Sequence, residues 1–327
     1  MTAFVKRREL LLGLAALPMA SRIAVAETYP SRPVRILVAT SAGGGTDLVA
    51  RFIAQWLTER LGQSFVVENR PGGGNNIGTE LAARSPADGY TLFMANTVNT
   101  INNSLYQKLN YNFIADFAPV ANVMGTPLLV LVHPSVAANS AAELIALAKV
   151  SPGKLNLASG GVGSTGHMSA ELFQMMAGIK FIHVPYRGEA PALTDLIAGQ
   201  AQLMVSTTGS ALQYARAGTV RALATTTDDR VAELPDVAPL SKTLPGYRAN
   251  AWSGLFLPKG TPTAIVSKLN AAASEAMDSK AVQDRMHELG TTLVGPDRRS
   301  PEYLQALVDQ EIAKWGPLIK AAGISAD

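Results

Sequence analysis

Two glycine-rich segments carry the residues best suited to bind a ligand. The first runs from Gly43 to Asp47, and the second runs from Gly160 to Thr165. Glycine lets the backbone come close to a ligand, and the first turn of a following helix leaves N–H groups without backbone partners. Because the helix dipole favours negative charge at that end, each segment is a candidate anion site. Each segment taken alone could equally be a tight turn.

The second segment also fits a dinucleotide-binding fingerprint. Gly161, Gly163 and Gly166 have the G-x-G-x-x-G spacing between a predicted strand and a predicted helix. The fingerprint needs an acidic residue about 20 positions further on to hold the ribose. The next strand, however, ends near Pro185, and the first acid, Glu189, lies beyond it. The missing acid argues against dinucleotide binding, but the glycine spacing alone leaves a dinucleotide-dependent oxidoreductase as an alternative function.

The other residue types favour binding over catalysis. None of the four histidines, His133, His167, His183 and His287, has the spacing of a metal site. The chain has no cysteine, which excludes disulfides and thiolate chemistry. Ser164 and His167 could share a helix face, but the G-x-S-x-G elbow of a serine hydrolase is absent. We expect His167 to hydrogen-bond at the helix start, and we expect no enzyme activity, no metal and no cofactor.

Strands that alternate with helices are expected to position the two segments. In the first half, strands are predicted at 34–39, 65–68 and 90–94, with helices at 46–61 and 77–84. The second half repeats the pattern with strands at 127–133, 155–159, 181–184 and 203–206, and helices at 141–150, 165–177, 190–198 and 209–217. Two more helices are predicted at 263–277 and 301–321. This alternation predicts an α/β fold of two doubly wound lobes around a central cleft.

The N-terminus has the layout of a signal peptide over residues 1–26. Lys6, Arg7 and Arg8 precede an apolar run at 10–19, and a small-x-small triplet ends at Ala26. The run is shorter than the roughly 20 residues of a spanning helix. The Arg pair leaves the twin-arginine and general secretory routes both open. Removal of this segment changes 28 basic and 25 acidic residues to 24 of each. We expect a soluble, neutral periplasmic protein with no nucleic-acid partner.

Short motifs along the whole mature chain resemble one family. The motifs are Tyr29-Pro30-Ser31-Arg32-Pro33-Val34, Ala42-Gly43-Gly44-Gly45-Thr46-Asp47, Val67-Glu68-Asn69-Arg70-Pro71-Gly72, Asp88-Gly89-Tyr90-Thr91-Leu92, His183-Val184-Pro185-Tyr186-Arg187-Gly188, Ala190-Pro191-Ala192-Leu193-Thr194-Asp195-Leu196, Gly254-Leu255-Phe256 and Pro258-Lys259-Gly260-Thr261-Pro262. In this order, between about 29 and 323, they resemble the Bug family, the extracytoplasmic solute receptors of tripartite tricarboxylate transporters.

The resemblance implies a periplasmic-binding-protein-like Venus flytrap. Residues 27–126 and 250–327 would form one lobe, and residues 127–249 the other. The implied ligand is a small carboxylate, held by backbone groups and ordered water from the two glycine turns. The implied protein partners are membrane transporter subunits or, without transport, a signalling partner, and the receptor is expected to be a monomer.

These expectations define the candidate ligand-binding residues. They are Ser41, Gly44 and Thr46 in the first turn, Gly161, Gly163, Ser164 and Thr165 in the second, Thr97 and Asn99 in a loop after Met94, and Ser206 and Thr207. Asp47 is expected to cap the helix after the first turn, since a carboxylate beside a bound anion is unfavourable.

Three positions depart from the family pattern. Members often have an Asp-Asn pair where this chain has Ser206 and Thr207, and a small residue where it has Glu189. The effect of these changes on ligand preference stays open. Arg187 is expected to pair with Glu189 at the rim of the cleft, and the alternative is that it pairs with a second carboxylate of the ligand.

Overall fold

The computed structural model describes residues 29–228, 230–288 and 291–326. The expected signal peptide, 1–26, lies outside these residues. No helix within the described ranges has both the length and the apolar character needed to cross a bilayer.

The first lobe is built around a parallel sheet whose central strand leads into the first glycine turn. Its strands are β1 (Val34–Val38), β2 (Phe65–Asn69) and β3 (Thr91–Asn96), and its helices α1 (Gly45–Leu61), α2 (Asn76–Ala83) and α3 (Thr97–Leu105) follow them in turn. β1 pairs in parallel with both β2 and β3. Val49, Ile53 and Leu57 recur every fourth residue of α1 and are buried against this sheet.

The second lobe repeats this arrangement. Its strands β5 (Asn156–Ser159), β6 (Ile182–Pro185) and β7 (Leu203–Thr207) are followed by α5 (Thr165–Ala177), α6 (Glu189–Ile197) and α7 (Thr208–Arg216). β5 lies between β6 and β7, as β1 lies between β2 and β3. Helix α4 (Ala141–Val150) and strand β8 (Arg221–Thr225) complete the lobe. The prediction of two doubly wound lobes is confirmed, and both glycine turns leave the carboxyl end of a central strand.

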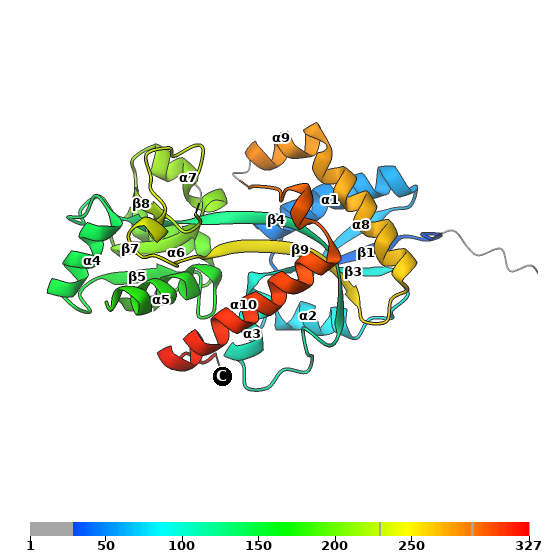
Figure 1. The fold of residues 1–327 in the computed structure, drawn as a ribbon, viewed down its shortest axis with the longest axis horizontal. Helices are drawn as coiled ribbons and strands as arrows, with labels where there is room; N and C mark the ends of the chain where they lie inside the picture. Colours follow the sequence, from blue (N-terminus) through cyan, green and yellow to red (C-terminus); the bar gives the residue numbers. More distant parts are fainter. Residues whose placement is uncertain (1–28, 229, 289–290, 327) are drawn as a thin grey trace, which may run out of the picture.

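Two long strands connect the lobes. β4 (Phe117–Val132) and β9 (Asn250–Pro258) run side by side between them (Figure 1). β4 pairs with β9 up to Pro127, and from Leu128 it pairs with β7 and β8. The sequence predicted only the second part of β4, because the register shifts twice in the first part. The lobes are therefore joined through a continuous strand and not by a flexible linker.

Two helices pack against both lobes on one face. In Figure 1, α10 (Pro301–Ala322) crosses from one lobe to the other, with α3 beside it. Trp315 and Leu318 of α10 and Leu105 of α3 share one buried cluster with Leu128 and Val130 of β4. On the other side of the first sheet, α8 (Thr263–Asp278) packs on α1 and is followed by α9 (Lys280–Glu288). The assignment of residues 27–126 and 250–327 to one lobe stays a prediction.

Candidate ligand-binding site

The first turn is held in place by Asp47. Helix α1 begins after Gly44, which makes no side-chain cap, so the predicted capping role takes another form. The Asp47 carboxylate accepts hydrogen bonds from Gly43 N–H (2.8 Å), Arg51 Nε (3.0 Å) and Asn69 Nδ2 (2.9 Å). Burial alone would raise the pKa of Asp47, but these hydrogen bonds lower the pKa below its usual value. The turn is thereby fixed to α1 and to the end of β2.

The exposed side of the first turn offers hydrogen-bond donors. Residues 41–45 are exposed, and this stretch includes the candidates Ser41 and Gly44. Gly45 and Thr46 are the first two residues of α1, so their N–H groups have no partner within the helix. Thr46 Oγ1 lies 3.4 Å from Ser253 Oγ and 3.4 Å from Asn96 Nδ2. The start of α1 therefore lies against β9, where β9 enters the first lobe.

The second turn uses several of its own donors internally. Ser164 caps α5 by accepting a hydrogen bond from His167 N–H at 3.3 Å. Gly163 N–H donates to His167 Nδ1 at 3.2 Å, and Gly161 N–H donates to Ser159 Oγ at 3.1 Å. Three of the predicted ligand-binding residues, Gly161, Gly163 and Ser164, therefore already form hydrogen bonds within the protein. The N–H groups of Thr165 and Gly166 begin α5 and have no helical partner.

A pair of stacked imidazoles supports the second turn. The rings of His167 and His183 lie 3.9 Å apart at 15°. His183 Nε2 is 2.6 Å from Ser159 Oγ, which in turn bonds Gly161. Nδ1 of His167 carries no proton, because it accepts the hydrogen bond from Gly163 N–H. Burial is the main cause that lowers the pKa of His183 to about 4. His167 acts here as the hydrogen-bonding residue that we expected and not as a base.

Close packing explains the spacing of the glycines in the second turn. Gly163 has φ +75°, and a β-carbon there would lie 2.3 Å from Leu105 Cδ2 of α3. A β-carbon at Gly166 would lie 2.1 Å from the Val205 carbonyl oxygen. The fingerprint therefore reflects contacts with α3 and β7. The strand β6 ends at Pro185, without the acid that a ribose requires.

The second-tier candidates Thr97 and Asn99 lie in a helix and not in the predicted loop. They belong to the first turn of α3, and each is 1% exposed. Asn96 and Asn99 form a reciprocal capping box. Asn99 Nδ2 also donates to Thr79 Oγ1 at 2.8 Å, and Thr97 Oγ1 accepts from Trp252 N–H at 2.9 Å. Both side chains therefore connect α3 to its neighbours.

Ser206 and Thr207 contact Glu189 at the end of β7. The Glu189 carboxylate accepts hydrogen bonds from Ser206 Oγ (2.6 Å), Thr207 N–H (2.8 Å) and Ser210 Oγ (3.0 Å). The predicted Arg187–Glu189 pair is wrong, because the carboxylate points toward β7 and α7. Arg187 is exposed and forms no ion pair within the described residues. The hydroxyl residues at the end of β7 and directly after it were the sequence signal for this cluster.

Comparison with known proteins identifies the family. A family model described as tripartite tricarboxylate transporter family receptor matches residues 49–324. The chain belongs to this family. BugT of Bordetella pertussis is 35% identical to the receptor over 301 residues, 91% of each chain, which confirms the Bug resemblance.

Solved structures agree with this membership. Rpa4515 of R. palustris, in a structure with adipate, is 36% identical, with a TM-score of 0.81 over 91% of this receptor and 99% of that chain. MatC of Rhodopseudomonas palustris, with bound malate, is 34% identical, with a TM-score of 0.79 over 89% of this receptor and 100% of that chain. The family consists of solute-binding receptors and not of enzymes, so the oxidoreductase alternative is wrong.

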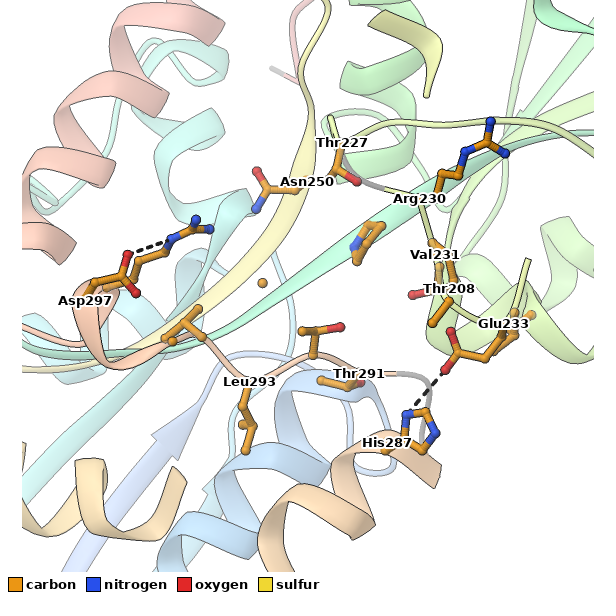
Figure 2. A pocket seen from close by; sticks show the side chains of 18 residues that line it. Thr208, Thr227, Arg230, Val231, Glu233, Asn250, His287, Thr291, Leu293 and Asp297 are labelled. Atoms are coloured by element: carbon orange, nitrogen blue, oxygen red, sulfur yellow. Dashed lines mark hydrogen bonds and ion pairs between the residues drawn. The ribbon is translucent and has the colours of Figure 1, made fainter. Parts of the chain in front are cut away.

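The receptor also has a cavity of about 510 Å³ along β4 and β9. Both lobes line it, with Thr208 and Glu233 on one side and His287 and Leu293 on the other (Figure 2). His287 Nδ1 lies 3.4 Å from Glu233 Oε1, a contact that sequence reasoning missed. Neither glycine turn lines this cavity. The candidate site is therefore defined by the helix starts. Within the described residues, no cluster of His, Asp and Glu could hold a metal ion.

Proposed function

We propose that the chain is a periplasmic receptor that captures a small organic carboxylate and presents it to the membrane subunits of a tripartite tricarboxylate-type transporter. The observation that carries this proposal is the pair of helix starts. The first N–H groups of α1 and α5 have no helical partners, and both helices follow the central strand of a sheet. Helix starts in this position bind anions. The adipate and malate in the structures of the two relatives support a carboxylate.

The two turns would contribute different groups to this site. In the first turn, the N–H groups of Gly45 and Thr46, with Ser41 and Gly44 beside them, would donate to one side of the carboxylate. In the second turn, the N–H and hydroxyl of Thr165 would donate from the other lobe, directly or through water. Gly161, Gly163 and Ser164 would hold that turn in shape, since their groups already have partners.

A binding screen with the mature protein tests the proposal. Thermal unfolding is followed with a panel of mono-, di- and tricarboxylates, and each hit is confirmed by calorimetry. A ligand that binds only the folded state at 100 times its Kd adds about 2.7 kcal/mol to the free energy of unfolding. The amides of the same acids serve as controls, because they lack the charge. Stabilisation by NAD, or by no acid of the panel, would contradict the proposal.

A further screen separates transport from signalling. Uptake of the bound acid into vesicles that contain the transporter's membrane subunits is expected to require this receptor. Binding without receptor-dependent uptake would favour the signalling alternative. We propose that the receptor acts as a monomer, which the mass measured by light scattering checks.

A further inference from the structure

Glu189 occupies a set of hydrogen-bond donors at the carboxyl end of β7. Its Oε1 accepts from Ser206 Oγ and Thr207 N–H, and its Oε2 accepts from Ser210 Oγ. Thr207 Oγ1 lies 3.3 Å from both carboxylate oxygens. No ion pair reaches this carboxylate within the described residues. Three hydroxyl groups and one N–H group therefore satisfy it in place of a cation.

The backbone of Glu189 lies next to the second glycine turn, and its carboxylate lies at the end of the neighbouring strand β7. Strands β7 and β5 are parallel neighbours, about 4.8 Å apart as in any sheet, and their carboxyl ends lead into Thr208 and Gly160. A β-carbon at Gly160 would stand 3.1 Å from Glu189 N, so the start of α6 touches the turn. Glu189 is only partly buried. A fixed carboxylate thus borders the edge of the sheet where the ligand is proposed to bind.

We infer that Glu189 selects the ligand by its charge: the receptor takes an acid with one carboxylate and a hydroxyl at its other end, and rejects an acid with a carboxylate at both ends. This inference rests on the proposed function. It separates this receptor from Rpa4515 and MatC, whose structures contain the diacids adipate and malate.

Two physical effects act in the same direction. A second ligand carboxylate at this place would find the donors of Ser206, Thr207 and Ser210 already bonded to Glu189. It would also meet the like charge of Glu189, which is partly buried and is therefore screened less than a fully exposed carboxylate. A ligand hydroxyl, in contrast, can donate to a free lone pair of the carboxylate.

Matched pairs of acids test the inference. Binding to the mature protein is measured by calorimetry for succinate with γ-hydroxybutyrate, adipate with ω-hydroxycaproate, and suberate with ω-hydroxycaprylate. For any pair that binds, we expect the hydroxy acid to bind about tenfold more tightly, which equals about 1.4 kcal/mol. Glu189→Gln keeps the shape and an acceptor for Thr207 N–H, and Glu189→Ala also frees the donors. We expect Glu189→Gln to reduce the ratio and Glu189→Ala to bring it to unity or reverse it.

Glu59→Gln, an exposed position on α1, is the control and should leave the ratio unchanged. A general loss of stability would weaken both acids of a pair alike, so the ratio isolates charge selection. A diacid that binds as tightly as its hydroxy acid, or a ratio that neither Glu189 variant changes, would overturn the inference and leave the proposed function intact. The same holds if acids of the wider panel bind but no hydroxy acid does. If no acid binds at all, the proposed function fails as well.

Discussion

The two glycine turns occupy matching places in their lobes, but they are supported by opposite chemistry. A buried carboxylate, Asp47, holds the first turn. Two stacked imidazoles, His167 and His183, hold the second. The packing differs too: a β-carbon at Gly45 would meet nothing within 4 Å, whereas one at Gly166 would lie 2.1 Å from a carbonyl oxygen.

This difference shows that a glycine turn before a helix can be held in place by a carboxylate in one lobe and by imidazoles in the other. The residues that support a turn are expected to decide how its stability responds to an added β-carbon and to acid. A variant that changes one turn can therefore be compared with the other turn, or with a distant residue, as its reference.

The largest difference is expected when one methyl group is added to each turn. Gly166→Ala forces α5 away from the Val205 carbonyl oxygen, and we expect a loss of about 3 kcal/mol in the free energy of unfolding. Gly45→Ala has open space and should change this free energy by less than about 1 kcal/mol. Urea unfolding at neutral pH measures both. Equal effects would show that the two turns are packed alike.

Loss of the carboxylate should weaken the first turn alone. Asp47→Asn removes the charge that binds Arg51 and Gly43 N–H, and we expect a loss of about 2 kcal/mol at neutral pH. Because folding lowers the pKa of Asp47, its contribution is present above its ordinary pKa of 3.8 and is lost as the pH falls through the lower folded value. Urea unfolding between neutral and acid pH checks this. Asp309→Asn on the surface of α10 should have little effect at any pH.

The second turn should respond to acid at a higher pH than the first. Folding lowers the pKa of His183 from 6.5 to about 4, so between these values the unfolded chain binds a proton that the folded chain does not. The contribution of His183 to the free energy of unfolding is therefore complete above pH 6.5. It decreases as the pH falls toward 4, by on the order of 2 kcal/mol. His183→Gln should flatten the unfolding free energy over this range, while His287→Gln on the surface should not. An unchanged slope in His183→Gln would refute this role for the imidazole.

The smallest effects are expected for the two threonine hydroxyls. Thr46 Oγ1 already lies near Ser253 and Asn96, whereas Thr165 Oγ1 shows no side-chain partner among the described contacts. Under the proposed function, Thr165→Val should weaken binding by about fivefold, roughly 1 kcal/mol, and Thr46→Val by less. Calorimetry with the tightest-binding acid of the panel measures both. A larger loss at Thr46 would reverse the ranking of the two turns.

Local patterns made much of the fold predictable. The helix at Ala141–Val150 and the stop of α5 at Gly178 lie where the sequence placed them, because periodicity and a left-handed glycine are local signals. Helix α3 was missed because its residues are mostly poor helix formers, and its capping box at Asn96 and Asn99 went unrecognised. Helix α9 was missed as well, because most of its residues are polar and only Val282 and Met286 mark its buried face.

The glycine turns of the candidate site could be predicted from the sequence, but the residues that support them could not. The glycine turns are contiguous in sequence, so their positions could be read directly. Their supports are not contiguous: Asp47 reaches Asn69, His167 stacks on His183, and Glu189 reaches Ser206. These contacts depend on which strands become neighbours in the sheet. One sequence without the fold contains no signal for that choice.

The path of α10 has a consequence for the order in which the molecule is completed. Trp315, Leu318 and Ile319 fill the cluster that also holds Leu105 and Val130. These three residues are added to the growing chain after nearly all other buried residues of the receptor. A chain that ended before Trp315 would lack these side chains and would leave the apolar surface around Leu105 and Val130 uncovered. Burial of this surface therefore depends on α10.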